Sequence, residues 1–323
     1  MPVLTFLPAS RISRFGAALA SVLILAACSQ EASTPAPTDS DDAPVLTGTV
    51  RIDGSSTVFP ISEAIAEEFR AVAPDIRVTV GSSGTGGGFS KFMAGEIDIN
   101  DASRPVKAEE IAKGASTGVE YLEIPVAYDG LSIVVNPANT FVDYLTVAEL
   151  KLIWEPGSTV DSWNDVRAEW PDQPLRLYGP GTDSGTFDYF TEAIVGTAGA
   201  ARPDYTASED DNILVQGVAG DDGGLGFFGF AYYEASASHL KLVPVDGGTG
   251  PIAPTVSNIN DGTYSPLSRP LFIYVSKSSA ARPEVRSLID FYLETVPGIA
   301  ADVGYVALPD TMYSAGKSAF ANF

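Results

Sequence analysis

Between residues 49 and 99 short β-prone runs alternate with helical stretches, and this order constrains the fold more than any other feature. Residues 49–52, 76–80 and 97–99 are expected strands. Residues 62–72 are an expected helix, because their apolar side chains recur at the spacing of one helix face, and a shorter helix is expected around 89–94. A β-α-β-α order favours a largely parallel sheet flanked by helices. The sequence therefore predicts an α/β fold.

Two later apolar runs, 130–136 and 269–275, are rich in β-branched and aromatic residues and are expected strands. Each is a candidate to cross between two lobes. One lobe would then hold 47–130 plus 275–323, and the other would hold 131–270. Two lobes joined by a hinge of two crossing strands leave a ligand cleft, an arrangement suited to ligand-triggered closure. The alternative is a single continuous α/β domain.

Residues 1–27 are typical of a signal peptide. Arg11 and Arg14 precede an apolar run that is too short for a permanent membrane span and ends in small residues. The run ends at Cys28 in a pattern resembling a bacterial lipobox, so Cys28 is the expected lipidation site; an ordinary signal peptide with a chance cysteine is the alternative. Residues 28–46 are polar, acidic and Pro-rich and predict a flexible, lipid-anchored tether. We therefore expect an exported periplasmic or cell-surface lipoprotein.

The composition excludes several classes of protein. The formal net charge of −22 argues against nucleic-acid binding, which needs a basic surface. Cys28 is the single cysteine, so the rest of the chain can form neither a disulfide nor a thiolate metal site. His239 is the single histidine and cannot build an imidazole metal cluster. No metal and no cofactor are expected.

Three turns rich in Gly, Ser and Thr each lead into an expected helix, at residues 53–60, 81–88 and 179–187. A helix N-terminus exposes unpaired N–H groups and the positive end of the helix dipole, so it binds anions readily. Ordinary helix capping is the alternative for any one turn. None of the turns has the lysine of a nucleotide-binding P-loop or the pattern of a serine nucleophile elbow. Together they predict a shared anion site without a catalytic residue.

Arg104 follows the expected strand at 97–99, in a turn fixed by Pro105. A guanidinium group matches a tetrahedral oxyanion through two parallel hydrogen bonds. Arg104 is therefore a candidate anion ligand. The alternative is a structural ion pair with Asp98 or Asp101 nearby.

Five stretches between about residue 50 and about residue 280 resemble the PstS-type phosphate-binding proteins, members of the type II periplasmic binding protein superfamily that serve the bacterial phosphate-specific ABC transporter. The stretches are DGSSTVFPISEAIAEEFR, VGSSGTGGGFSKFMAGEIDINDASRP, YGPGTDSGTFDYFTEAIVG, GLGFFGFAYYEA and SRPLFIYVSK. The resemblance implies two α/β lobes with dehydrated phosphate in the cleft. It also implies a monomer that delivers phosphate to a membrane permease.

Matching the family motifs carries the phosphate-binding positions onto a set of residues in three turns. They are Ser56, Thr57 and Val58, then Ser82, then Ser184, Gly185 and Thr186.

The chain also departs from the family pattern. Pro180 stands where other members have an arginine, and Arg104 stands at or beside the place of an aspartate that accepts the phosphate proton. The acceptor therefore stays open among Asp183, Asp101 and Asp129. Asp183 is preferred because it adjoins the hydroxyl-rich turn.

Two other functions stay open. The first is a binding protein for another tetrahedral oxyanion, such as sulfate, molybdate or arsenate. The second is an exported phosphatase, although the sequence has neither a nucleophile elbow nor a cluster of metal ligands.

Overall fold

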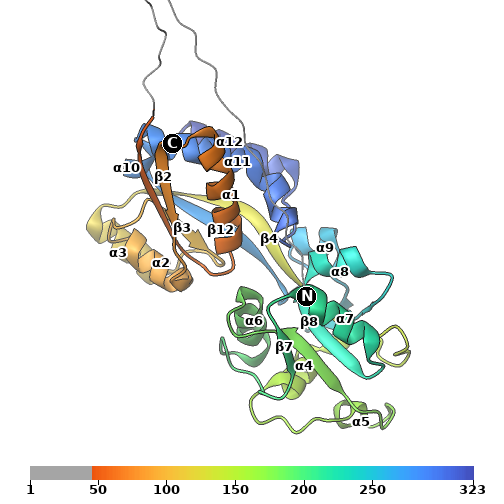
Figure 1. The fold of residues 1–323 in the computed structure, drawn as a ribbon. Helices are drawn as coiled ribbons and strands as arrows, with labels where there is room; N and C mark the ends of the chain where they lie inside the picture. Colours follow the sequence, from red (N-terminus) through yellow and green to blue (C-terminus); the bar gives the residue numbers. More distant parts are fainter. Residues whose placement is uncertain (1–45) are drawn as a thin grey trace, which may run out of the picture. The chain divides into compact units, whose positions relative to one another are not determined.

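The computed structural model describes residues 46–323, which form a mixed α/β fold (Figure 1). The expected α/β class is confirmed. The predicted signal peptide, Cys28 and all of the tether except Leu46 lie outside the described residues. The chain begins with β1 (Gly48–Gly54), α1 (Phe59–Val72), β2 (Ile76–Val80), α2 (Gly84–Phe92), β3 (Ile99–Ala102), α3 (Ala108–Thr117) and β4 (Tyr121–Val135).

The middle of the chain forms a second group of elements, and the last part returns to the first group (Figure 1). The second group is β5 (Leu145–Thr146), α4 (Val147–Trp154), α5 (Trp163–Val166), β6 (Arg176–Pro180), α6 (Gly185–Phe190), the π-helix η1 (Thr191–Val195), β7 (Thr206–Ser208), α7 (Asp211–Gly220), β8 (Gly224–Gly229), α8 (Phe230–Ser236), β9 (Lys241–Leu242), β10 (Val245–Asp246), β11 (Pro251–Ile252) and α9 (Val256–Asn260). The returning elements are β12 (Ser268–Ser276), α10 (Lys277–Ala280), α11 (Pro283–Asp302) and α12 (Asp310–Ala321).

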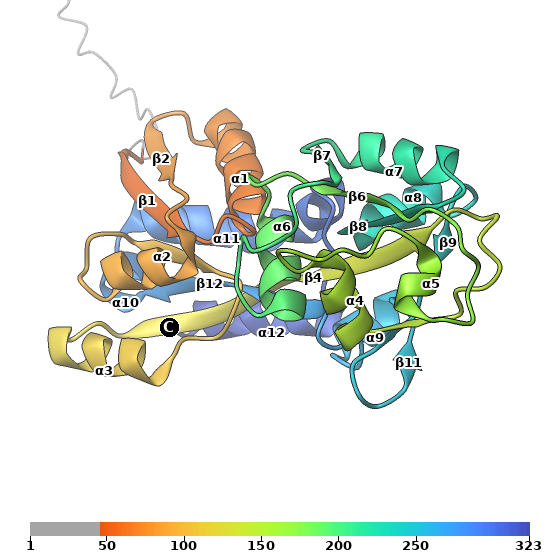
Figure 2. The ribbon, with the colours of Figure 1, turned by 90° about the horizontal axis from the view of Figure 1, so that it is seen from below.

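One sheet connects the two groups, in the strand order β2-β1-β3-β12-β4-β8-β6-β7, with β9 also paired to β4. The strands β2, β1 and β3 are parallel, as expected. The long strand β4 pairs with β12 over its first part and with β8 from Leu131 onward, so it belongs to both halves of the sheet (Figure 2). The two runs expected to cross between lobes are thus β12 and the second part of β4.

Two hydrophobic cores lie on either side of this crossing. The first core draws on β1, α1, β12 and α11, with Ile52, Phe69 and Tyr292 among its members. The second core draws on the middle of the chain, with Trp154 and Phe227 in edge contact. Burying a large apolar side chain contributes about 1.5–3 kcal/mol, so each half has its own source of stability.

The first helix shows what the apolar spacing predicts well and where it fails. Ile61, Ile65 and Phe69 are buried on one face of α1 as expected. The helix begins at Phe59 instead of residue 62, because Pro60 is tolerated in a first turn where N–H groups have no partner anyway. Val72 was expected on the apolar face but is 64% exposed, because it lies in the last turn beyond the core.

The second helix corrects the sequence prediction. A helix was expected around 89–94 after a glycine-rich turn, but α2 already begins at Gly84. The run of glycines therefore forms the first turns of the helix itself. The strand expected at 97–99 is also displaced, and β3 begins at Ile99. Within residues 46–323, no helix combines the length and the apolar character needed to cross a membrane.

Candidate functional site

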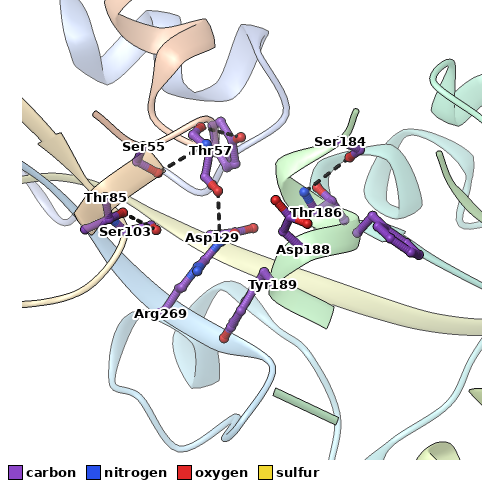
Figure 3. Close-up of polar contacts among 12 residues, drawn as sticks. Ser55, Thr57, Thr85, Ser103, Asp129, Ser184, Thr186, Asp188, Tyr189 and Arg269 are labelled. Atoms are coloured by element: carbon purple, nitrogen blue, oxygen red, sulfur yellow. Dashed lines mark hydrogen bonds and ion pairs between the residues drawn. The ribbon is translucent and has the colours of Figure 1, made fainter. Parts of the chain in front are cut away.

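A cavity of about 550 Å³ lies where the turns before α1 and α2 face helix α6 and the start of β12 (Figure 3). Its lining is rich in hydroxyl groups and includes two guanidinium side chains. The polar lining residues on the α1 and α2 side are Ser55, Ser56, Thr57, Thr85, Ser103 and Arg104. Those from α6, η1 and β12 include Asp188, Tyr189, Glu192 and Arg269. We call this space the first cavity.

A second cavity of about 440 Å³ shares Ser56 with the first. It contains most of the residues expected from the third glycine-rich turn. The predicted site residues along its wall are Ser56, Ser82, Asp183, Ser184, Gly185 and Thr186. Asp183 is joined there by Glu209 and Asp211, and none of the lining residues among the described part of the chain is a lysine or an arginine. The positive charge expected at an anion site is therefore in the first cavity.

The turn before α1 has a fixed shape. The N–H of Ser55 donates to the carbonyl oxygen of Asp101 at 3.0 Å, and the Ser55 hydroxyl accepts from the N–H of Thr57 at 3.2 Å. Gly54 is required here, because its φ is +143° and a Cβ would lie 2.1 Å from that same carbonyl oxygen. The predicted residue Val58 is fully buried at the helix start and lines neither of the two cavities.

The predicted turns before α1 and α6 meet at one point. A Cβ built on Gly185 would lie 2.8 Å from the Thr57 hydroxyl oxygen and 3.0 Å from the Thr57 backbone nitrogen. The Ser184 hydroxyl accepts from the N–H of Thr186 at 3.2 Å and caps α6. The structure thus brings Ser56 and Thr57 together with Ser184, Gly185 and Thr186, which lie on different halves of the sheet.

Arg104 lines the first cavity, but it also forms an ion pair. Its Nη1 and Nη2 donate to the two carboxylate oxygens of Glu110 at 2.9 and 2.8 Å. The hydrogen bonds and the charge of Glu110 raise the pKa of Arg104. The alternative of an ion pair with Asp98 or Asp101 was wrong in its partner, because the first turn of α3 brings Glu110 opposite the guanidinium.

Arg269 is a cationic site residue that the sequence analysis missed, as it missed Asp188 and Glu192 in the same cavity. It lies at the start of β12, directly opposite Asp129 of β4 in the strand register. Its Nε and Nη2 both donate to Oδ2 of Asp129 at 3.2 Å, and Nη2 also donates to the Thr57 hydroxyl at 2.9 Å (Figure 3). The guanidinium lies 3.7 Å from the ring centre of Tyr189 in α6, a cation–π contact. Arg269 therefore contacts the hinge and both halves at once.

Two of the three candidate proton acceptors are buried away from the cavities. Asp101 is fully buried and accepts a hydrogen bond from Ser62 at 2.9 Å. Burial raises the pKa of Asp101 to about 8, which the hydrogen bond from Ser62 opposes. Asp129 is 1% exposed behind Arg269, and burial raises its pKa while the Arg269 charge lowers it.

Asp101 makes folding stability depend on pH. Its pKa is higher in the folded protein than the ordinary value of 3.8, so the folded state binds more protons between those two values. Stability should therefore fall as pH rises toward about 8, by at most about 1.4 kcal/mol per pH unit from this one group. Asp101→Asn should flatten that slope in urea unfolding measured from pH 5 to pH 9. An unchanged slope would show that Asp101 is already ionised at low pH.

Hydrogen-bond donors and charged groups set the chemistry of the site. Within residues 46–323, no group of three His, Cys, Asp or Glu side chains is placed to hold a metal ion. The first cavity combines hydroxyl donors with two guanidinium groups, which suits a small oxyanion. An α/β fold with two cores, two crossing strands and such a cavity between them is the architecture of a solute-binding protein.

Comparisons with known proteins agree with this class. A family model described as a PBP superfamily domain matches residues 32–295, and the chain belongs to this superfamily. The chain is 51% identical over 274 residues to protein SphX of a Synechocystis species, covering 84% of this chain and 82% of the relative. It is 40% identical over 273 residues to the phosphate-binding protein PstS of Staphylococcus saprophyticus, covering 84% of each.

A solved structure supports the same class of protein. The crystal structure of a possible phosphate binding protein from Planctomyces limnophilus superposes with a TM-score of 0.83 at 48% sequence identity, covering 86% of this chain and 99% of that one. The predicted resemblance to PstS-type proteins is thus confirmed.

Proposed function

We propose that this chain captures inorganic phosphate outside the cytoplasm and delivers it to the membrane permease of an ABC importer. The observation that carries the proposal is Arg269, whose guanidinium is held by Asp129 and faces a hydroxyl-lined cavity between the two halves. Such a group supplies the positive charge that the chain lacks at Pro180, where the family has an arginine. The relatives named as phosphate-binding proteins support the same ligand.

The proposed ligands lie around the point where Thr57 approaches Gly185. Besides Arg269, they are Ser56, Thr57, Val58, Ser82, Arg104, Ser184, Gly185 and Thr186. A micromolar affinity requires about 8 kcal/mol. Hydrogen bonds to a charged group contribute about 1.5–3 kcal/mol each, so several of these donors suffice after the costs of desolvation and closure. Arg104 contributes less than Arg269 because Glu110 binds both of its Nη atoms, at 2.9 and 2.8 Å, whereas Asp129 binds Nε and Nη2 of Arg269 at the longer distance of 3.2 Å.

The architecture around the site belongs to the same proposal. The lobes would be 47–130 plus 275–323 and 131–270, which the separation of the two cores supports. Cys28 would carry the lipid anchor, and 28–46 would tether a monomeric domain at the periplasmic or cell surface. No enzymatic activity is proposed, since two of the relatives compared are named for phosphate binding.

Titration calorimetry of the purified, phosphate-stripped protein tests this function. We expect one phosphate to bind per chain, with little loss of affinity in excess sulfate. Binding that sulfate abolishes would point instead to a general oxyanion carrier. No heat with either anion, together with turnover of a phosphomonoester, would replace the transport function by a phosphatase.

A further inference from the structure

A phosphate ion enclosed in this site needs a hydrogen-bond acceptor. Near neutral pH phosphate carries at least one proton, whereas sulfate carries none. The donors around the site serve the unprotonated oxygens of either anion. The protonated oxygen of phosphate is left without a partner unless an acceptor faces it, and an unpaired buried polar group is costly. A carboxylate is the acceptor that discriminates best, because it can only accept and its charge repels an unprotonated sulfate oxygen. The residue that accepts this proton therefore also decides between phosphate and sulfate.

The structure argues against all three acceptors considered from the sequence. The Asp101 carboxylate is fully buried beneath α1 and is bound by Ser62. Asp129 is 1% exposed, and its Oδ2 already accepts from two nitrogens of Arg269. Asp183 is exposed in the second cavity, beside other carboxylates and away from both arginines.

Two carboxylates do line the first cavity, namely Asp188 and Glu192. Asp188 is half-buried in α6, two residues after Thr186 and next to Tyr189, whose ring lies against Arg269. Figure 3 shows Asp188 projecting from α6 toward Thr57 and Arg269. Glu192 follows one turn later in η1 and is exposed.

The surroundings of Asp188 suit a proton acceptor. Burial raises the pKa of Asp188, the Arg269 charge lowers it, and the charge of Glu192 raises it again. Asp188 is thus a partly desolvated carboxylate that feels the charge of Arg269. Among the described residues no hydrogen bond or ion pair joins the two side chains, and Nε and Nη2 of Arg269 donate to Asp129 and Thr57 instead. Asp188 thus keeps an oxygen available for a ligand.

We propose that Asp188 accepts the hydrogen bond from the protonated oxygen of bound phosphate and thereby excludes sulfate. The proposal rests on the proposed function, because it assumes that phosphate binds between Thr57, Arg269 and α6. It assigns the acceptor role to the half of the fold opposite the turn that carries Arg104.

The test is the ratio of phosphate to sulfate affinity, measured by calorimetry on the wild type and on Asp188→Asn. The carboxamide can accept from phosphate through its oxygen or donate to sulfate through its nitrogen. We therefore expect the ratio to fall by roughly tenfold to a hundredfold, mostly through a gain in sulfate affinity. The matched control is Glu192→Gln, the same kind of change one turn away, which should leave the ratio within about twofold.

The other possible results show whether Asp188 is the acceptor. An unchanged ratio in Asp188→Asn, or an equal loss of both anions, would overturn the acceptor role. A melting curve shows whether the variant folds, and Asp188→Ser provides a smaller second replacement that should lower the ratio in the same direction. If the wild type binds neither anion, both the proposed function and the role of Asp188 are overturned. If the wild type binds phosphate, the proposed function stands and the variants test the role of Asp188 alone.

Discussion

Replacing Arg269 by glutamine should weaken phosphate binding by at least about a hundredfold. The change removes a charged donor that faces the first cavity, and charged hydrogen bonds contribute about 1.5–3 kcal/mol each. It also leaves Asp129, which is 1% exposed, as an unpaired carboxylate beside the anion. A hundredfold loss corresponds to about 2.8 kcal/mol, which lies within the sum of these two effects. Calorimetry with phosphate measures the loss directly.

Two further variants test whether the charge of Arg269, its hydrogen-bonding geometry, or its position in the cavity matters for phosphate binding. Arg269→Lys keeps the charge but loses the planar fork that holds Asp129 and Thr57 together, so we expect an intermediate affinity. Arg104→Gln is the matched control, because Arg104 lines the same cavity but both of its Nη atoms are already bound by Glu110. The affinity lost in Arg104→Gln should be tenfold or less. If Arg104→Gln weakened phosphate binding more than Arg269→Gln does, the site would be centred on Arg104 and our assignment of Arg269 would be wrong.

The parts of the fold that sequence could predict are those set by local pattern. The apolar spacing of Ile61, Ile65 and Phe69 defines a helix face without reference to the rest of the chain, and α1 has that face buried. The start of α2 could not be predicted in this way. Glycine has a low helix propensity, so the local pattern argues against a helix over that run. In the fold Gly88 packs so closely against Asn100 and Gly54 that a Cβ there would clash, and this tertiary contact requires glycine inside the helix.

The same distinction applies to the site. The hydroxyl-rich turns were found because helix-start chemistry is carried by adjacent residues such as Ser184 and Thr186. Arg269 was missed because its role depends on Asp129, which lies 140 positions away in sequence and becomes its neighbour only through the pairing of β12 with β4. A signal was present in the sequence, since an arginine at the start of an otherwise apolar crossing strand is unusual. The role of Arg269 could be recognised only once the strand register placed it opposite Asp129.

Gly185→Val should weaken phosphate binding by roughly tenfold to a hundredfold while leaving the melting temperature of the ligand-free protein nearly unchanged. Gly185 does not have a positive φ angle, so the backbone itself accepts a side chain. The obstacle lies across the cleft, where a Cβ would approach the Thr57 hydroxyl to 2.8 Å and the Thr57 backbone to 3.0 Å. The two halves must then part, which lengthens every hydrogen bond made from both sides to one anion. The two hydrophobic cores do not include this contact, so the stability of the ligand-free protein should change little.

Gly86→Ala provides the control, because Gly86 lines the first cavity and its added Cβ would meet only Nη2 of Arg104, at 3.8 Å, an ordinary contact. Its phosphate affinity should stay within about threefold of the wild type. X-ray scattering adds a second measurement: phosphate should reduce the radius of gyration of the wild type and of Gly86→Ala, and should reduce that of Gly185→Val less. Normal affinity and normal compaction in Gly185→Val would mean that the approach of Thr57 to Gly185 is not part of the ligand-bound state, and that phosphate binds deeper in the first cavity, around Arg269 alone.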